Sequence, residues 1–286
     1  MSLSIIIVSF NTKTLTLQCL KLLTDLSAEI IVVDNASTDG TVPALQAQYP
    51  HVIIIPNHQN LGFSKACNLG AKQALGEYVL FLNSDTIATP EAILELLIHH
   101  SDIATCRLIN PNGSLQPQGG YLPNLINLPL WMLNLDHLPI LRLALKPYQL
   151  RTPDFFREDH LMGWVSGTAL MVKKSIYQKL HGFDENLFMY AEDLDFCYRA
   201  HQYGFSINYY ATPQITHLGQ GSGSSRGAIL GEYQGLIYYF KKHRPAWQLP
   251  VVKFWLTIGA LLRAFVFGMI GNDERRQIYQ QAVKVV

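Results

Sequence analysis

Apolar runs in the first third of the chain alternate with segments of helical spacing. Three runs are rich in Ile and Val, at residues 3–8, 30–33 and 52–55, and a fourth apolar run follows at 78–82. Unbroken runs of this kind are typical of parallel strands covered on both faces. One amphipathic stripe is formed by Leu15, Cys19, Leu22, Leu23 and Leu26. With further helices expected near 41–49 and 62–75, the alternation predicts an α/β fold with a mainly parallel, right-handed central sheet.

The pattern is less regular beyond the fourth strand. Residues 107–160 are expected to form an apolar insertion, in which Pro111-Asn112-Gly113 makes a turn between two short strands. Strands are expected again at 167–172 and 205–210, with a helix carrying several acids at 191–203 between them. The tail is helical. We therefore expect a main domain of residues 1–225 and a C-terminal helical extension of residues 226–286.

Composition and charge narrow the class of protein. Of 286 residues, 15% are charged and the formal net charge is +1, which argues against disorder and against nucleic-acid binding driven by positive charge. The four cysteines are scattered, so they indicate reduced thiols in a cytosolic protein rather than a disulfide framework or a zinc cluster. The N-terminal apolar run has no basic leader and predicts a buried strand, not a signal peptide.

Polar residues follow all four of the first strands. They occupy residues 9–11, 34–37, 57–60 and 83–85. Because ligands of parallel α/β sheets bind outside the carboxyl ends of the strands, four polar ends in succession predict one binding crevice. Turns and helix caps would explain any single one of them equally well.

Three further features have side chains suited to catalysis or metal binding. Asp85, at the rim of the sheet, can hold a divalent cation on a diphosphate, although a surface loop is the commoner setting for such a residue. Glu192, Asp193 and Asp195 gather at a predicted helix N-terminus, where the helix dipole alone would favour acids and where a carboxylate can also act as a general base. His217 follows a strand-like stretch and is either a structural residue or a ligand for a transition ion.

Taken together, these motifs resemble the family 2 glycosyltransferases, particularly their rhamnosyltransferase-like branch. The matching stretches occur in the family's order over residues 3–225, and they are 7–11, 33–40, 60–63 with Asn68, 82–85, 166–169 and 191–195. The resemblance implies a single Rossmann-like nucleotide-diphospho-sugar transferase domain of GT-A type. It also implies an inverting transferase that uses a nucleotide-sugar donor and a divalent metal, Mn²⁺ or Mg²⁺.

The resemblance assigns roles to individual residues. Asp34 would receive the imide of the base, and the other residues lining the nucleotide cleft would be Ser9, Asn11, Asn35, Asn60, Asn68 and Asn83. Asp85 matches the last acid of the family's D-x-D metal motif. Asn83 replaces its first acid, so His217 is expected as the second metal ligand.

The same resemblance assigns the acceptor side of the site. Asp193 matches the catalytic base, which takes the proton of the acceptor hydroxyl opposite the leaving diphosphate. Glu192 would orient the acceptor, and Asp195 is expected to support the start of the helix. Gly167 would lie on the acceptor-facing wall.

The expected activity is transfer of a sugar, rhamnose from dTDP-rhamnose or another sugar from a dTDP- or UDP-linked donor, to a growing cell-surface glycan or a lipid-linked acceptor. The alternative from another class is an inactive sugar-nucleotide-binding subunit of a membrane-bound glycan assembly complex. A nucleotidyltransferase is disfavoured because no glycine-rich basic phosphate loop lies near residue 10. Formation of a homo-oligomer is left open.

Residues 249–271 are almost wholly apolar but contain Lys253, Thr257 and Arg263, which form a narrow polar strip on a helix. Two cations inside the segment disfavour spanning a membrane, at roughly 2.5–3.5 kcal/mol for each one placed centrally. Two alternatives remain for this helix: it packs against protein, or it lies on a membrane surface. The basic run 241–244 favours surface contact through residues 241–271, and hence a cytoplasmic protein peripheral to the inner face of the cell membrane.

Overall fold

The computed structural model describes residues 2–136, 138, 145–219 and 225–286. By internal contacts the chain forms two compact units. Unit 1 comprises Met1–Gln118 and Arg151–Ser222, and unit 2 comprises Gly119–Leu150 and Gly223–Val286. The sequence predicted a single boundary at residue 225. The structure differs, because residues 119–150, which belong to the expected insertion, are grouped with the C-terminal helices.

Unit 1 contains the central sheet, whose strand order is β3-β2-β1-β4-β10-β6-β11-β5. Its strands, including β8, which pairs with β11, are β1 (Leu3–Ser9), β2 (Glu29–Asp34), β3 (Ile53–Pro56), β4 (Tyr78–Asn83), β5 (Thr86–Ile87), β6 (Ile103–Ile109), β8 (His160–Leu161), β10 (Ala169–Lys173) and β11 (Ile207–His217). The first four strands along the chain are parallel to one another, as are β6 and β11. Strand β10 is antiparallel to both of its neighbours. The expected mainly parallel α/β sheet is confirmed.

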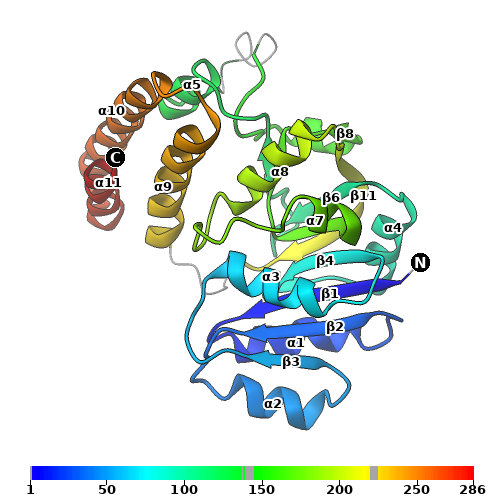
Figure 1. Ribbon diagram of the computed structural model, residues 1–286. Helices are drawn as coiled ribbons and strands as arrows, with labels where there is room; N and C mark the ends of the chain where they lie inside the picture. The colour runs from blue at the N-terminus through cyan, green and yellow to red at the C-terminus, as the bar shows by residue number, and fades with distance from the viewer. Residues whose placement is uncertain (1, 137, 139–144, 220–224) are drawn as a thin grey trace. The chain divides into compact units, whose positions relative to one another are not determined.

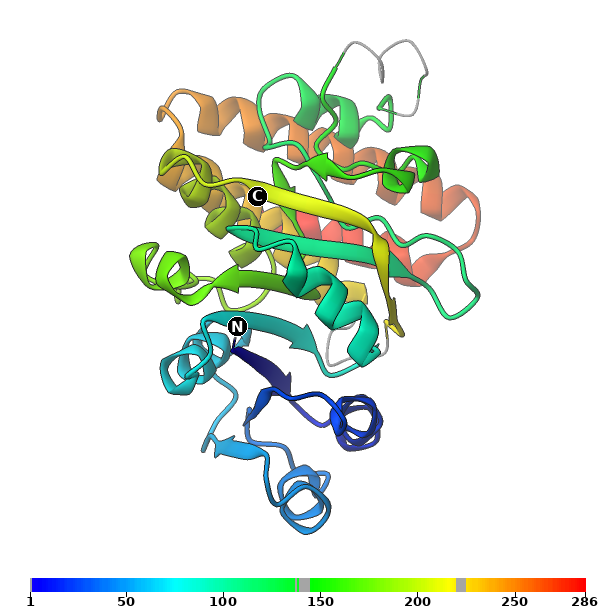
Figure 2. The same cartoon turned by 90° about the vertical axis from the view of Figure 1, so that its right-hand side faces the viewer.

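Helices cover both faces of this sheet (Figure 2). The helices of unit 1 are α1 (Lys13–Leu23), α2 (Thr41–Gln48), α3 (Phe63–Gln73), α4 (Pro90–Ile98), α7 (Lys174–Lys179) and α8 (Glu192–Gln202), with a short 3₁₀ helix at Pro153–Arg157. Helices α1 and α4 share one hydrophobic core with the side chains of Ile5 and Ile7. Ile6 points to the opposite face, where α3 approaches so closely that a Cβ on Gly70 would lie 2.6 Å from the Ile6 side chain.

Two expectations about strands need correction. The insertion does not begin at residue 107, because residues 107–109 complete the central strand β6. The expected strand at 205–210 continues to His217 as β11, past an irregularity between Tyr210 and Gln214. A local pattern could not show this, because β11 has buried and exposed positions in irregular order.

Unit 2 is helical. It contains α5 (Asn127–Met132), α9 (Ser225–His243), α10 (Gln248–Met269) and α11 (Asp273–Val285), together with the two-residue strand β7 (Gly119–Gly120) (Figure 1). Helix α10 packs against α5, α9 and α11. The tail is thus helical, as expected.

Arg263 does not lie on an outward polar strip with Lys253 and Thr257. Its guanidinium donates hydrogen bonds to the carbonyl oxygens of Trp131, at 2.9 Å, and Met132, at 2.8 Å. These carbonyls belong to the end of α5, so the cation satisfies helix-terminal acceptors. The outward face of α10 consequently contains large apolar side chains. By length and composition α10 is one candidate membrane-spanning helix among the described residues, with 28% of its most apolar window buried.

Candidate active site

The sheet register brings the polar strand ends together. Ser9 lies opposite Asp34 across β1 and β2, and Val8 lies opposite Asn83 across β1 and β4. Asp34 is 2% exposed, and its Oδ2 accepts a hydrogen bond from Ser37 N at 2.9 Å. Its Oδ1 is buried and has no hydrogen-bond partner among the described residues. Because such an atom is costly to bury unpaired, it is suited to accept an N–H from a ligand.

The remaining residues expected to line the nucleotide cleft instead connect the loops at this edge. Ser9 is fully buried and bonds to the hydroxyls of Thr12 and Thr16, each at 3.0 Å. Asn11, at φ 54°, accepts from Thr38 N at 2.7 Å. The side chain of Asn35 is 2% exposed. Its Nδ2 donates to Gly62 O at 3.1 Å, and its Oδ1 accepts from Asn57 at 2.9 Å.

Two further asparagines have similar internal roles. Asn60 Oδ1 accepts from Gly62 N at 2.9 Å, which shapes the turn into α3. Asn68 Oδ1 accepts from the Tyr177 hydroxyl at 2.5 Å and from Phe183 N at 3.0 Å. Its Nδ2 donates to Phe183 O at 2.9 Å and to Glu185 Oε1 at 3.1 Å. The polar side-chain atoms of Ser9 and Asn68 are thus engaged within the protein.

Asp85 and His217 meet across a strand pair. Strand β5 begins directly after Asp85, and its Thr86 lies opposite His217 of β11. This register places His217 Nε2 at 3.2 Å from Asp85 Oδ1, and Asp85 is 4% exposed. On the other side of the ring, Nδ1 lies 3.0 Å from Gln116 Oε1. With Nδ1 donating to the Gln116 oxygen, Nε2 would offer its lone pair to a cation beside the carboxylate, the arrangement that outer partners of metal-binding histidines enforce.

These two residues fit a divalent cation in donor chemistry, since imidazole nitrogen and carboxylate oxygen both bind Mn²⁺. Among the described residues, no group of three or more His, Cys, Asp or Glu side chains gathers as a metal site. A cation at Asp85 and His217 would therefore need its other ligands from substrate and water, which is the usual arrangement for metals that bind a nucleotide diphosphate.

Asp193 occupies the first turn of α8, next to the start of β10. Its Oδ2 accepts from Gly167 N at 3.0 Å and its Oδ1 from Leu194 N at 2.7 Å. Thr168, beside Gly167, accepts from Asn83 N at 2.9 Å through its carbonyl oxygen. These contacts connect Asp193 to the C-terminal end of β4, next to the Asp85–His217 pair.

The electrostatic setting distinguishes the two acids at the start of α8. Burial, with the neighbouring Asp193 charge adding to it, raises the pKa of Glu192 to about 8. Burial also raises the pKa of Asp193, to about 6, against the lowering effect of the hydrogen bonds from Gly167 and Leu194. Asp193 is partly accessible and Glu192 is 5% exposed, so at neutral pH the raised pKa values favour the ionised form of Asp193 over that of Glu192. The first is suited to accept a proton and the second to donate a hydrogen bond.

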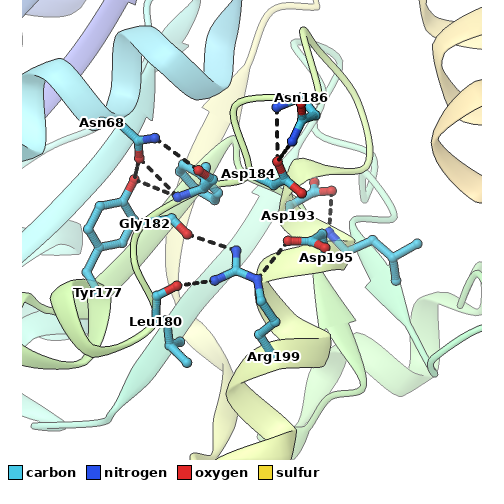
Figure 3. A network of polar contacts seen from close by, with 11 residues as sticks. Asn68, Tyr177, Leu180, Gly182, Asp184, Asn186, Asp193, Asp195 and Arg199 are labelled. Atoms are coloured by element: carbon cyan, nitrogen blue, oxygen red, sulfur yellow. Dashed lines mark hydrogen bonds and ion pairs between the residues drawn. The ribbon is translucent and has the colours of Figure 1, made fainter. Parts of the chain in front are cut away.

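Two residues that support the site were not expected from the sequence. Gln116 orients His217, and Arg199 forms an ion pair with Asp195 at 2.8 Å (Figure 3). Arg199 stands four residues after Asp195, a spacing that favours an ion pair on a helix, so this signal was present in the sequence. Gln116 had no such signal, because its proximity to His217 depends on long-range strand pairing.

The sheet with polar strand ends, the carboxylate–imidazole pair and the acids at the start of α8 together are the features expected of a nucleotide-sugar transferase of GT-A type. The family model for glycosyl transferase family 2 matches residues 4–121. Over 289 aligned residues the chain is 28% identical to an N-acetylglucosaminyl-diphospho-decaprenol L-rhamnosyltransferase of Mycobacterium tuberculosis, covering 91% of this chain and 89% of the relative. Residues 4–121 thus match the family 2 glycosyltransferases, and over nearly its whole length the chain is similar to a rhamnosyltransferase.

Other similar proteins agree with this assignment. A low-salt glycan biosynthesis hexosyltransferase of Haloferax volcanii is 30% identical over 193 residues, covering 63% of this chain and 55% of the relative. The structure of a Pyrobaculum calidifontis mannosyltransferase in complex with GDP-Man and Mn²⁺ matches with a TM-score of 0.60 at 16% identity, covering 99% of this chain and 86% of that one. TarS of Staphylococcus aureus, in complex with UDP-GlcNAc, matches with a TM-score of 0.54 at 15% identity, covering 99% and 92%. At these identities the structures support the fold.

Proposed function

We propose that the protein transfers rhamnose from dTDP-rhamnose to a lipid-linked glycan acceptor, with inversion at the anomeric carbon and with a divalent cation bound. The observation that carries the proposal is the joint placement of Asp193 and the Asp85–His217 pair along one edge of the sheet. The choice of sugar and acceptor rests on the mycobacterial rhamnosyltransferase, which is similar over nearly the whole chain.

Each residue of the site has a chemical role in this proposal. Asp193 accepts the proton of the attacking hydroxyl, and the N–H groups of Gly167 and Leu194 hold its carboxylate in place. Glu192, protonated at neutral pH, donates a hydrogen bond that orients the acceptor. Asp34 Oδ1 accepts the imide N–H of the base, which satisfies its buried lone pairs. Asp85 and His217 would hold the cation, which neutralises the charge that develops on the leaving diphosphate.

The direct test is a donor panel with purified protein and a lipid-linked N-acetylglucosamine acceptor. We expect release of dTDP from dTDP-rhamnose, dependent on acceptor and on added Mn²⁺ or Mg²⁺, and slower release of nucleotide from UDP- and GDP-linked sugars. Turnover of another donor would replace rhamnose in the proposal. Binding of nucleotide by calorimetry without any donor turnover would instead establish an inactive binding subunit.

We further propose that unit 2 contacts the cytoplasmic surface of the membrane through residues 241–271. At 100° per residue, Phe254, Leu261 and Phe265 lie within about 40° of one another on α10, and Arg263 lies about 180° from Phe254. Each of the three apolar side chains is about half exposed or more. Exposed Trp247, Lys241 and Lys242 lie just before or at the start of the helix. An apolar face beside exposed cations is suited to an anionic bilayer surface.

Liposome flotation tests this contact. The parent protein should float with anionic vesicles, and the Phe254→Glu/Phe265→Glu variant should not. Leu75 and Leu161 are exposed apolar residues of unit 1, so Leu75→Glu/Leu161→Glu changes the charge equally and should still float. A parent protein that stays at the bottom of the gradient and forms a dimer in solution would assign the face to packing between copies.

A further inference from the structure

The segment between α7 and α8, residues 180–191, is held at several points before it reaches Asp193 (Figure 3). Phe183 is bonded through both its N–H and its carbonyl oxygen to Asn68 of α3. Further along, Phe188 O accepts from Phe63 N at 2.7 Å. The segment ends with Tyr190 and Ala191 at φ 73° and 66°, a left-handed conformation that costs non-glycine residues energy and persists only when the surroundings impose it.

Arg199 provides much of that restraint from within α8 itself. Its guanidinium donates to the carbonyl oxygen of Leu180 and, at 2.8 Å, to that of Gly182. Its Nε donates to Asp195 Oδ2 at 2.8 Å, and Asp195 is 1% exposed. One planar group thus joins the start of the segment to the first turn of the helix that carries Asp193. Lysine cannot reproduce this, because its ammonium lacks the fixed fork of donors.

We propose that Arg199 is a positioning residue for Asp193. By tying the start of residues 180–191 to α8, the helix that begins where this segment ends, it holds the strained pair Tyr190–Ala191 and so directs the Asp193 carboxylate onto Gly167 N. The inference rests on the proposed role of Asp193 as the base. Arg199 itself lies in the last turn of α8, away from Asp193 in the first turn, and is bonded to protein groups, so it acts through the backbone and does not contact the acceptor.

The test compares Arg199→Lys with the parent in initial-rate kinetics. We expect kcat to fall about 10²-fold, the loss that a small misplacement of a reacting group can cause, with the KM for the donor unchanged within about twofold, because donor-binding groups lie on other strand ends. The matched control is Arg157→Lys, which alters an exposed ion pair with Asp154 in the same unit and should leave kcat unchanged.

A double variant separates positioning from general loss of structure. If Arg199 acts through Asp193, Arg199→Lys should lower kcat little further in an Asp193→Asn background, because the two losses are not additive. An equal loss in both backgrounds, an unchanged kcat in the single variant, or a loss of donor affinity would overturn the inference. If Asp193→Asn alone has parent activity, the proposed base is wrong, and that result is distinct from failure of the positioning role.

Asp195→Asn provides a second variant should Arg199→Lys fail to fold. It removes the charge of the ion pair and keeps the guanidinium bonds to both carbonyl oxygens. We expect a smaller fall in kcat with the same unchanged KM and the same non-additivity with Asp193→Asn. A fall that persists in the Asp193→Asn background would count against the proposal here too.

Discussion

The pH dependence of turnover follows from the setting of Asp193. The perturbation is acidification from pH 7 to pH 5. The group that responds is the Asp193 carboxyl, because burial raises its pKa from 3.8 to about 6. A base works only when it is unprotonated, so activity should be lost as the pH falls through that value. About 90% of Asp193 is ionised at pH 7 and about 9% at pH 5, which predicts roughly a tenfold fall in kcat/KM. With a pKa of 3.8, about 94% would remain ionised at pH 5 and the rate would barely change.

The assay is kcat/KM for the acceptor between pH 5 and pH 9, followed by release of nucleotide at saturating metal. Glu192→Gln is the matched variant. Because the pKa of Glu192 is about 8, its side chain is already neutral near pH 6, and a neutral amide should leave the acid limb of the profile in place. Any change in the alkaline limb that ionisation of Glu192 causes should disappear in this variant. A profile that stays flat down to pH 5 in the parent protein would show either that the pKa of Asp193 is not raised or that Asp193 is not the base.

The remaining predictions concern the site and its support. Asp193→Asn should lower kcat by about 10²–10⁴-fold, the typical worth of a general base, while calorimetry shows nucleotide affinity nearly intact; unchanged turnover would move the base to another acid. Asp85→Ala, and to a lesser degree His217→Ala, should weaken donor binding only when metal is present, and activity that withstands a chelator would exclude the metal role of both. Gly182→Ala should lower the free energy of unfolding, measured in urea, by about 1–3 kcal/mol. The reason is that Gly182 has φ +68° and a Cβ there would lie 2.4 Å from Asn68 Oδ1. A stability equal to that of the parent would show that the segment moves freely to accept the methyl group.

The local parts of the fold could be predicted from the sequence, and the long-range parts could not. The first four strands and helix α3 follow from runs of Ile and Val and from helical spacing, which are properties of adjacent residues. The apolar run of strand β6 is interrupted by Thr105 and Arg107, and its central place in the sheet depends on pairing with β10 and β11, which lie far along the chain. The course of β11 to His217 depends on pairing with strands over 100 positions away in sequence, and no local pattern records that pairing.

The same distinction applies to the site. Acids and amides at strand ends could be recognised as a group, because parallel strands present their carboxyl ends at one edge. Whether each side chain faces the ligand or the protein depends on loop geometry. Asn68 illustrates this, since its side-chain amide forms hydrogen bonds with Tyr177 and Phe183, which lie over 100 residues later in the chain. Arg263 illustrates it on the helical side, where its partners are carbonyl oxygens that a helical wheel does not include.

Unit 2 is assembled from two stretches of chain, Gly119–Leu150 and Gly223–Val286, with strands β8, β10 and β11 of the central sheet encoded between them. During synthesis, helix α5 therefore leaves the ribosome long before α10, which covers it and supplies Arg263 to its final carbonyls. Its buried Leu128, Trp131 and Met132 would be uncovered in that interval, a period in which nascent chains depend on chaperones. For the same reason, a fragment made by removing the C-terminal helices would still contain α5 with its apolar side chains uncovered. A useful minimal protein would need residues 119–150 replaced by a short linker at the same time.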